Sequence, residues 1–178
     1  MSRELADPEL EARRLNALRL VRQFGDPVLR TPTGDVTEFD DALQDEIDRM
    51  ERIMIDAHGV GLAAPQVGTL RRLLVYRTGD GEPTQALVNP RLVWASEEQD
   101  VEAEGCLSIG EVAVDVPRAV EIRVEARAAD GADMTIEASG FEARVIQHEM
   151  DHLDGILILD RTTKDQRRDA LKALREQQ

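Results

Sequence analysis

The chain of 178 residues is poor in cysteine and histidine, with one cysteine and three histidines. A single cysteine excludes an internal disulfide and agrees with a reducing compartment. The first residues lack the apolar core of a secretory signal, and no apolar run approaches the roughly eighteen residues of a membrane span. We therefore expect a cytoplasmic protein with no membrane partner.

Aromatic side chains and positive charge are also scarce. One tryptophan, one tyrosine and three phenylalanines offer no base-stacking surface, so the core must consist mainly of Leu, Ile, Val, Ala and Met. The 22 lysines and arginines are outnumbered by 36 acidic residues, which gives a formal net charge of −14. Because the average field repels phosphate, we expect no direct DNA binding, although a local basic segment could still bind an anionic partner.

Hydrophobic periodicity predicts a helix and two strands in the first half of the chain. Residues 40–58 place Leu43, Ile47, Met50 and Met54 at helical spacing. The segment 59–68 is too rich in glycine and proline to continue that helix. Residues 72–77 and 85–94 have the Leu, Val and Tyr content of strands, with a turn at residues 79–81 between them.

The second half of the chain predicts a hairpin and two helices. Residues 119–127 alternate apolar and charged side chains, and a turn at residues 130–131 leads into a second alternating segment. A helix is expected over about residues 141–154 with Gly155 at its end, and a capping box at residues 163–166 opens a final helix. Without regular βαβ alternation, the pattern predicts an α+β fold with mostly antiparallel sheets packed around a functional helix.

The clearest chemical signal is the run QHEMDH at residues 147–152. On an α-helix positions i and i+4 share a face, so His148 and His152 can offer two imidazoles to one cation while Glu149 lies beside its open side. An activated water next to a carboxylate is the working part of a metal-dependent hydrolase. The alternative interpretation is a pair of helix histidines, one in the core and one in solvent.

A catalytic zinc-type site needs three protein ligands and an open fourth position. His58 and Cys106 are the candidates for the third ligand, because they are the remaining histidine and the only thiol. Cys106 follows a glycine in the segment EGCLS at residues 104–108, where the backbone can approach a bound group closely. A lone cysteine is by default a small buried hydrophobe, but the neighbouring H-E-x-x-H motif favours a ligand.

Three motifs occur in order along the chain, GVGLAAPQ at residues 59–66, EGCLS at 104–108 and QHEMDH at 147–152. Together they closely resemble the peptide deformylase family. The likeness runs from about residue 18 through the C-terminal helix, so we expect one catalytic domain over residues 1–178, with residues 1–17 as an extension of unassigned role. The resemblance implies one divalent metal, natively Fe²⁺ and often replaced by Zn²⁺, Ni²⁺ or Co²⁺, held by Cys106, His148 and His152.

The resemblance also implies removal of the formyl group from the N-terminal formyl-methionine of nascent polypeptides, with release of formate. Metal-bound water would attack the formyl carbon, with Glu149 as general base and then general acid. The family pattern assigns oxyanion stabilisation to the Gln66 side-chain amide and the Leu107 backbone N–H. Taken alone, Gln66 could instead be a loop amide bonded to its own backbone, and the motif favours the oxyanion role. Since the helix already supplies a base, Glu104 is expected to be a buried ion partner, with Arg118 as a candidate mate.

Substrate-binding residues are predicted in the same segments. An extended peptide could add as a strand to the backbone at Val60 and Gly61. Val145 lies one turn before His148, and Phe141 lies a further turn back. These two side chains are candidates either for an apolar pocket that receives the methionine or for ordinary core residues.

Two positions depart from the family pattern. Gly110 stands where many members have proline, and Ala113 stands where some have an arginine near the substrate peptide. Neither position touches the metal chemistry. The departures therefore concern which residues are preferred after the methionine.

The C-terminal helix is locally basic in an acidic chain. Five cations stand against three acids there: Lys164, Arg167, Arg168, Lys172 and Arg175 against Asp165, Asp169 and Glu176. In related enzymes such a helix can dock on the ribosome. The charge count favours a solvated helix face with i,i+4 pairs over a ribosome contact. The expected partners are therefore formylated nascent peptides, with the ribosome as a second candidate.

Two other protein classes share parts of this pattern. A small metallopeptidase also uses H-E-x-x-H, but it usually draws a third ligand from a downstream His or Glu, and His152 is the last histidine here. A non-enzymatic homologue would be expected to have lost the base or a ligand, whereas all of them are present. The sequence favours the deformylase and leaves open the native metal, the oligomeric state and whether the chain is a specialised copy.

Overall fold

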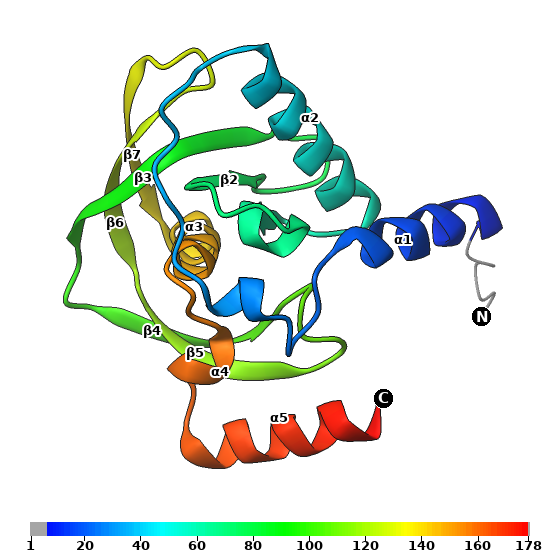
Figure 1. The fold of residues 1–178 in the computed structure, drawn as a ribbon. Coiled ribbons are helices and arrows are strands. Elements are labelled where there is room, and N and C mark those ends of the chain that lie inside the picture. Colours follow the sequence, from blue (N-terminus) through cyan, green and yellow to red (C-terminus); the bar gives the residue numbers. More distant parts are fainter. Residues whose placement is uncertain (1–6, 178) are drawn as a thin grey trace.

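The computed structural model describes residues 7–177. Helix α3 lies at its centre, seen end-on in Figure 1, and the strands curve around it. This is the expected α+β class, with antiparallel sheets around the central helix and a helix at the C-terminus. The elements are α1 (Pro8–Leu20), the 3-10 turn η1 (Pro27–Arg30), α2 (Asp41–Asp56), β1 (Gly61–Ala63), the 3-10 turn η2 (Ala64–Val67), β2 (Leu73–Tyr76), β3 (Gln85–Ala95), β4 (Gln99–Gly105), β5 (Ala113–Ala119), β6 (Glu121–Arg127), β7 (Asp133–Ser139), α3 (Gly140–Leu153), α4 (Ile158–Arg161) and α5 (Lys164–Glu176).

A five-stranded antiparallel sheet forms the larger wall around α3, in the order β1-β2-β3-β6-β7. In β6 the apolar side chains Ile122, Val124 and Ala126 are buried and the charged ones between them are exposed, as the alternation predicts. β6 and β7 pair along their full lengths, which confirms the predicted hairpin. The strand expected from residue 119 begins at Glu121 instead, because Ala119 ends the preceding strand.

The sequence pattern does not predict the two-stranded ribbon of β4 and β5. β4 is exposed along most of its length, and β5 contains Pro117, a residue that argues against a strand. The inner face of the ribbon nevertheless buries Glu104, Val116 and Arg118. The ribbon thus carries a carboxylate and a guanidinium to the side of α3, and β4 ends immediately before Cys106.

Helix α1 occupies most of the extension predicted over residues 1–17, of which residues 1–6 lie outside the described part of the chain. Asp7 caps the helix by accepting a hydrogen bond from the Glu9 N–H at 3.0 Å, and Pro8 occupies the first turn. Ala17 is buried while leucines elsewhere on the helix are exposed. Because those leucines do not share one face, helical periodicity gives little signal for α1.

Helix α2 confirms the predicted amphipathic segment and ends at Asp56, two positions before the expected end. Asp40 caps it by accepting from the Leu43 N–H at 3.0 Å. Helix α3 also matches its predicted span, and Gly155 follows it with φ of +74°. A Cβ at Gly155 would lie 2.7 Å from the Arg30 carbonyl oxygen, so both the backbone angle and the space require glycine.

Helix α5 begins as predicted, but its capping box is only half formed. The Thr163 hydroxyl accepts a hydrogen bond from the Gln166 N–H at 3.3 Å. The Gln166 side chain does not return to Thr163. It donates to Asp115 and accepts from the Asp115 N–H, which ties α5 to β5. The prediction of a hydrogen bond from the Gln166 side chain back to Thr163 is wrong, because the Gln166 side chain bonds to Asp115 of β5 instead.

Three hydrophobic clusters stabilise this arrangement. One lies between α3 and the five-stranded sheet, a second packs α2 on β1, β2 and β3, and a third joins β5 with η1, α4 and α5. Within residues 7–177, no helix combines the length and the apolar character needed to cross a bilayer.

Candidate functional site

The loop after β4 places Cys106 against the face of α3 that carries two histidines. One ligand atom from each of Cys106, His148 and His152 lies within 4.8 Å of the others, and the Cys106 Sγ is 3.3 Å from the His152 Nε2. Metal bonds of about 2.0–2.3 Å in a tetrahedral site separate the ligand atoms by roughly 3.5 Å, so this donor set fits one divalent ion. His58 does not join the cluster and lies at the cavity rim with φ of +59°.

A carboxylate fixes the orientation of the first histidine. The Glu104 Oε2 lies 2.9 Å from the His148 Nδ1. Glu104 is ionised and can only accept, so Nδ1 donates and Nε2 is left for the ligand cluster. Burial lowers the pKa of His152 well below its ordinary value, which favours the neutral imidazole that a metal requires.

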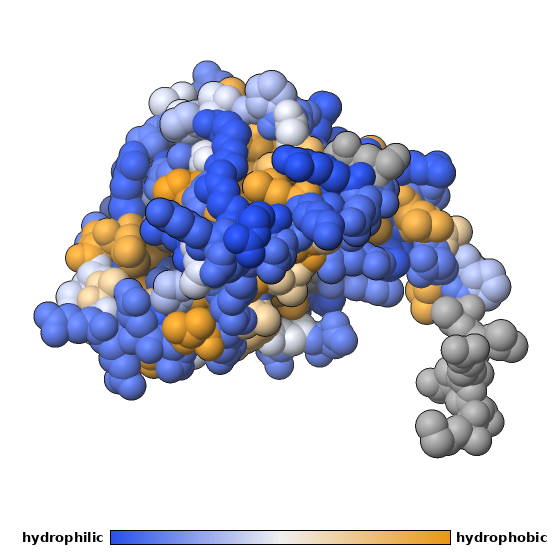
Figure 2. All heavy atoms as spheres, turned by 90° about the horizontal axis from the view of Figure 1, so that it is seen from below, coloured by the Kyte–Doolittle hydropathy of each residue, from blue (hydrophilic) through white to orange (hydrophobic). Residues whose placement is uncertain are grey.

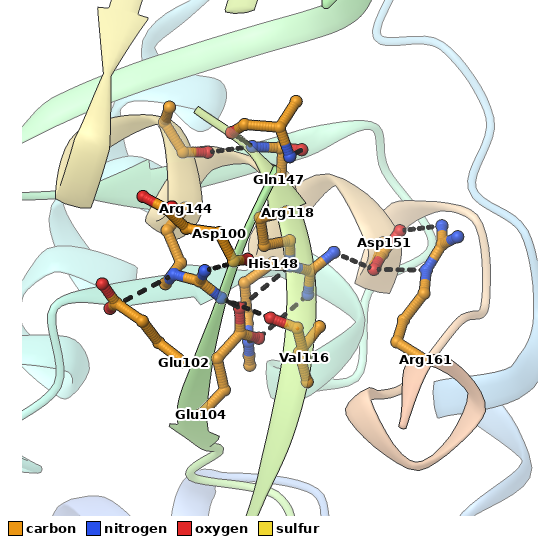
Figure 3. A network of polar contacts seen from close by, with 12 residues as sticks. Asp100, Glu102, Glu104, Val116, Arg118, Arg144, Gln147, His148, Asp151 and Arg161 are labelled. Carbon is orange, nitrogen blue, oxygen red and sulfur yellow. Dashed lines mark hydrogen bonds and ion pairs between the residues drawn. The ribbon is translucent and has the colours of Figure 1, made fainter. Parts of the chain in front are cut away.

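Two buried arginines hold Glu104 in place (Figure 3). Arg118 donates to both Glu104 oxygens at 2.9 Å, and Arg144 donates to the Glu104 Oε1 at 2.8 Å. Asp151, from the same helix as the histidines, accepts from Arg118 at 2.6 Å and from Arg161 at 2.7 Å. The expected pairing of Glu104 with Arg118 is confirmed, and it belongs to a larger network that connects the β4–β5 ribbon to α3.

This network sets the charge of Glu104. Burial by itself raises the pKa of the carboxyl group, but hydrogen bonds from Arg118 and His148 outweigh burial and lower the pKa to about 2. Glu104 is therefore ionised at neutral pH although its side chain is only 6 % exposed. A fixed negative charge behind His148 makes that imidazole a stronger donor to a metal ion.

We expect acid to weaken the fold through Glu104. Its pKa is about 2 in the folded protein against 4.5 ordinarily, so the unfolded chain binds the proton more tightly. The ionised group contributes roughly 3 kcal/mol, which is present above about pH 4.5 and lost as the pH falls towards 2. Urea unfolding of chelator-treated wild type and Glu104→Gln, from neutral pH into acid, measures this contribution.

The Glu104→Gln variant should be less stable at neutral pH, because two buried arginines lose their carboxylate, and should then lose less stability in acid. Glu137→Gln is the matched control, since the Glu137 side chain is 72 % exposed and pairs with Arg123 on the surface. An acid loss as steep in Glu104→Gln as in the wild type and the control would contradict this assignment.

Glu149 lies beside the histidines and is only 4 % exposed. Among the described residues, its Oε2 has no hydrogen-bond partner. Burial is the main cause that raises the pKa of Glu149 to about 7, and the negative charge of Glu104 adds to this rise. A carboxylate with a pKa near neutrality and a free oxygen is suited to accept and return a proton.

Strand β1 lies directly against the Glu149 carboxylate. A Cβ placed at Gly61 would contact the Glu149 Oε1 and lie 2.7 Å from the Glu149 Cγ. Glycine at this position therefore lets the backbone of an edge strand approach the Glu149 carboxylate.

We expect Gly61→Ala to lower kcat by roughly ten- to a hundredfold while the bound metal remains, because the added methyl displaces Glu149 but none of the three ligands. Steady-state kinetics with metal analysis would measure both quantities. Gly34→Ala is the matched control, since nothing lies within 4 Å of its added methyl. A Gly61→Ala protein as active as Gly34→Ala would show that the position of Glu149 is unimportant.

The Gln66 side chain combines the two interpretations left open by the sequence. Its Oε1 accepts from the Ala63 N–H at 2.9 Å, as a loop amide would. This bond orients the amide, so Nε2 points towards the site, 3.1 Å from the Ser108 Oγ and 3.6 Å from the Cys106 Sγ. Within residues 7–177 no hydrogen bond involves the Leu107 N–H, which remains available to a ligand.

These groups open into a cavity of about 870 Å³. Val60, Gly61, Phe141 and Val145, the predicted substrate-binding residues, all line it. Phe141 is 51 % exposed and stands at the rim, whereas Val145 is buried and also belongs to the core. β1 is the terminal strand of the larger sheet, so one of its edges has no neighbouring strand within residues 7–177.

Some residues of the site are not among those predicted from the sequence. Arg144 lies four residues before His148 on the same helix face, so a buried cation could have been inferred from helical spacing. Asp151 stands within the H-E-x-x-H motif, but its pairing with Arg118 and Arg161 depends on tertiary structure. The contribution of α1 to the cavity could not be predicted, because the sequence pattern did not indicate a helix over these residues.

An α+β fold whose central helix presents two imidazoles and a buried carboxylate beside a cysteine thiol defines a hydrolase of the H-E-x-x-H metal-site class. A family model described as Polypeptide deformylase matches residues 18–168. The chain belongs to the peptide deformylase family, metal-dependent enzymes that deformylate nascent peptides.

Relatives and solved structures agree with this assignment. A peptide deformylase of Thermotoga neapolitana is 46% identical over 141 residues, 79% of this chain and 85% of the relative. One from Parafrankia sp. is 43% identical over 160 residues, 90% of this chain and 87% of the relative. The structure of the Synechococcus elongatus enzyme in complex with actinonin has a TM-score of 0.83 at 38% identity and covers 86% of this chain and 85% of that one.

Proposed function

We propose that this chain removes the formyl group from the N-terminal formyl-methionine of nascent polypeptides and releases formate. The observation that carries the proposal is the cluster of Cys106, His148 and His152, of which Cys106 and His148 line one cavity together with Glu149. Membership of the peptide deformylase family supports it. The chain would act as one catalytic domain in the cytoplasm.

Cys106, His148 and His152 would hold the metal ion. The donor set of one thiolate and two imidazoles suits Fe²⁺, our proposed native ion, and also Zn²⁺, Ni²⁺ or Co²⁺. A divalent ion bound there supplies Lewis-acid chemistry, lowering the pKa of a water molecule and polarising a carbonyl group. In the described part of the chain, the buried Glu149 Oε2 and His152 Nδ1 have no hydrogen-bond partner, which agrees with a site that binds a further group.

Glu149 would move the proton of the reaction. Its carboxylate takes a proton from the attacking water as the new bond to the formyl carbon forms. The same oxygen then returns the proton to the amine nitrogen as the C–N bond breaks, so formate and a free N-terminus are the products. Water-excluding burial and a pKa of about 7 support both directions of this transfer.

Gln66 and Leu107 would stabilise the negative charge that develops on the formyl oxygen. The Gln66 amide is held with Nε2 towards Cys106 by the bond from Ala63, so little reorganisation is needed when the substrate binds. The Leu107 N–H adds a second donor from the loop that follows Cys106.

The peptide would bind in an extended conformation along the free edge of β1, at Val60 and Gly61. The methionine side chain would enter the apolar part of the cavity at Phe141 and Val145.

Product analysis separates the proposal from the other hydrolases that share the motif. The metal-loaded protein should release formate from formyl-Met-Ala-Ser and leave Met-Ala-Ser intact, and it should not cleave acetyl-Met-Ala-Ser at a comparable rate. Cleavage of the Met–Ala bond in the unformylated peptide would instead identify a metallopeptidase.

Helix α5 is the proposed contact if the protein docks on the ribosome. Lys164, Lys172 and Arg175 make no ion pair among the described residues, whereas Arg167 and Arg168 are paired with aspartates. Helix α5 lies on the side of the molecule that is seen in Figure 2. This outer face is largely hydrophilic, with hydrophobic side chains in separated patches, which also suits a solvated helix. Charge reversal of those three residues that leaves ribosome co-sedimentation unchanged would rule out this contact.

A further inference from the structure

We propose that helix α1 forms a wall of the substrate groove and that Leu15 and Leu18 bind an apolar side chain in the residues that follow formyl-methionine. The inference rests on the proposed function, because it assigns a role in the same cavity. It concerns the part of the substrate beyond the reacting bond, and it uses a segment that mostly precedes residues 18–168, where the family model matches.

The first support is that α1 and the metal-binding residues line one continuous cavity. Arg14, Leu15, Leu18 and Arg19 line this cavity together with Cys106, His148 and Glu149. These positions of α1 are spaced i, i+1, i+4 and i+5, so they share one side of the helix. A peptide that leaves the reacting centre along β1 therefore has α1 within the same cavity.

The second support is that α1 is held in place on its other side. Ala17 and Val21 are buried, and Val21 belongs to the cluster that includes α2. In Figure 1, α1 lies beside the end of α2. The capping bond of Asp7 further stabilises its first turn. The helix thus presents a fixed surface to the cavity.

The third support is the apolar surface left exposed around this cavity. Leu15 is 49 % exposed, Val60 40 % and Phe141 51 %, and all three line the cavity. Phe141 is assigned to the methionine, so Leu15 and the half-buried Leu18 remain for a later side chain.

The charged residues of the rim do not give a comparable preference. Arg14 and Arg19 on α1 share the cavity with Glu102 and Glu111, so both signs are present. Exposed charges form weak ion pairs, because water and salt screen them. Removal of apolar surface from water is the larger effect, and it favours a leucine-like side chain over a polar one.

The test compares kcat/KM for formyl-Met-Ala, formyl-Met-Ala-Ser, formyl-Met-Ala-Leu and formyl-Met-Leu-Ser in the metal-loaded protein. The wild type should prefer at least one leucine peptide over formyl-Met-Ala-Ser by roughly fivefold or more. Leu15→Ser with Leu18→Ser should reduce this ratio to near one. Leu10→Ser is the matched control, because Leu10 is 52 % exposed on the same helix and does not line the cavity.

The outcomes separate this inference from the proposed function. Absence of turnover with every formylated peptide would overturn the proposed function itself. Turnover without a leucine preference, or a preference that survives in the double variant, would overturn the role of α1 alone. Leu15→Ser by itself keeps the test decisive if the double variant unfolds, since half of that side chain is exposed and its loss should lower the ratio without costing the fold.

Discussion

Glu149→Gln should lower kcat for deformylation by about a thousandfold or more, with the metal ion still bound. Glutamine keeps the shape of the side chain but cannot take a proton from water or deliver one to the amine. The carboxylate is buried, and its Oε2 has no hydrogen-bond partner among residues 7–177, so no neighbouring group of that part of the chain replaces it. Formate release and metal content, measured on the same samples, test this expectation.

A matched comparison with Glu142→Gln separates the proton transfer from a general charge effect. Glu142 is on the same helix and accepts a hydrogen bond from the Tyr76 hydroxyl at 2.8 Å, away from the ligands. Its replacement should leave kcat within a few-fold of the wild type. Comparable losses in both variants, or a Glu149→Gln protein without metal, would contradict the assignment of Glu149 as the base.

His152→Ala should remove both the bound metal and the activity. The imidazole is 2 % exposed, and its Nε2 lies 3.3 Å from the Cys106 Sγ, so the variant leaves two ligands and a gap in the donor set. Loss of the Lewis acid should reduce turnover by on the order of a thousandfold or more. Chelation of the wild type should have the same effect, and added Ni²⁺ should restore only the wild type.

His58→Ala is the matched control for this experiment, because His58 is the remaining histidine and lies outside the ligand cluster. It should retain one metal ion per chain. Metal loss in His58→Ala together with retention in His152→Ala would exchange their roles and contradict the site described above.

The sequence predicts those parts of the fold that depend on local periodicity. α2, the β6–β7 hairpin and α3 follow from apolar spacing and turn residues, and the structure confirms them. The β4–β5 ribbon is not predictable in this way, because its stability comes from an ion network and from packing on α3 rather than from alternation in β4. Helix α1 is also not predicted by periodicity, because its leucines do not share one face.

The site shows the same division between local and tertiary information. The i,i+4 spacing places His148 and His152 on one face without any knowledge of the fold. The spacing of the histidines does not decide whether Cys106 or His58 is the third member of the cluster. Cys106 takes this place because β4 ends immediately before it. In the sequence, only the resemblance to the family indicated Cys106. The contact of Gly61 with Glu149 could not be foreseen, because it is an approach between β1 and α3.

The departure from the family pattern at Gly110 has a structural consequence. Gly110 has φ of +56°, which proline cannot adopt, and a Cβ there would lie 2.6 Å from the Gln177 Oε1. The loop that follows Cys106 is therefore packed against the end of α5 in this chain.

The central claim is tested most directly by formate release from formyl-Met-Ala-Ser while Fe²⁺ or Ni²⁺ is titrated into the anaerobically purified, metal-depleted protein. The account predicts that the rate rises in proportion to bound metal and reaches a plateau at one ion per chain. Fully metallated protein that releases no formate would contradict it and would indicate a homologue that binds the metal without catalysing the reaction.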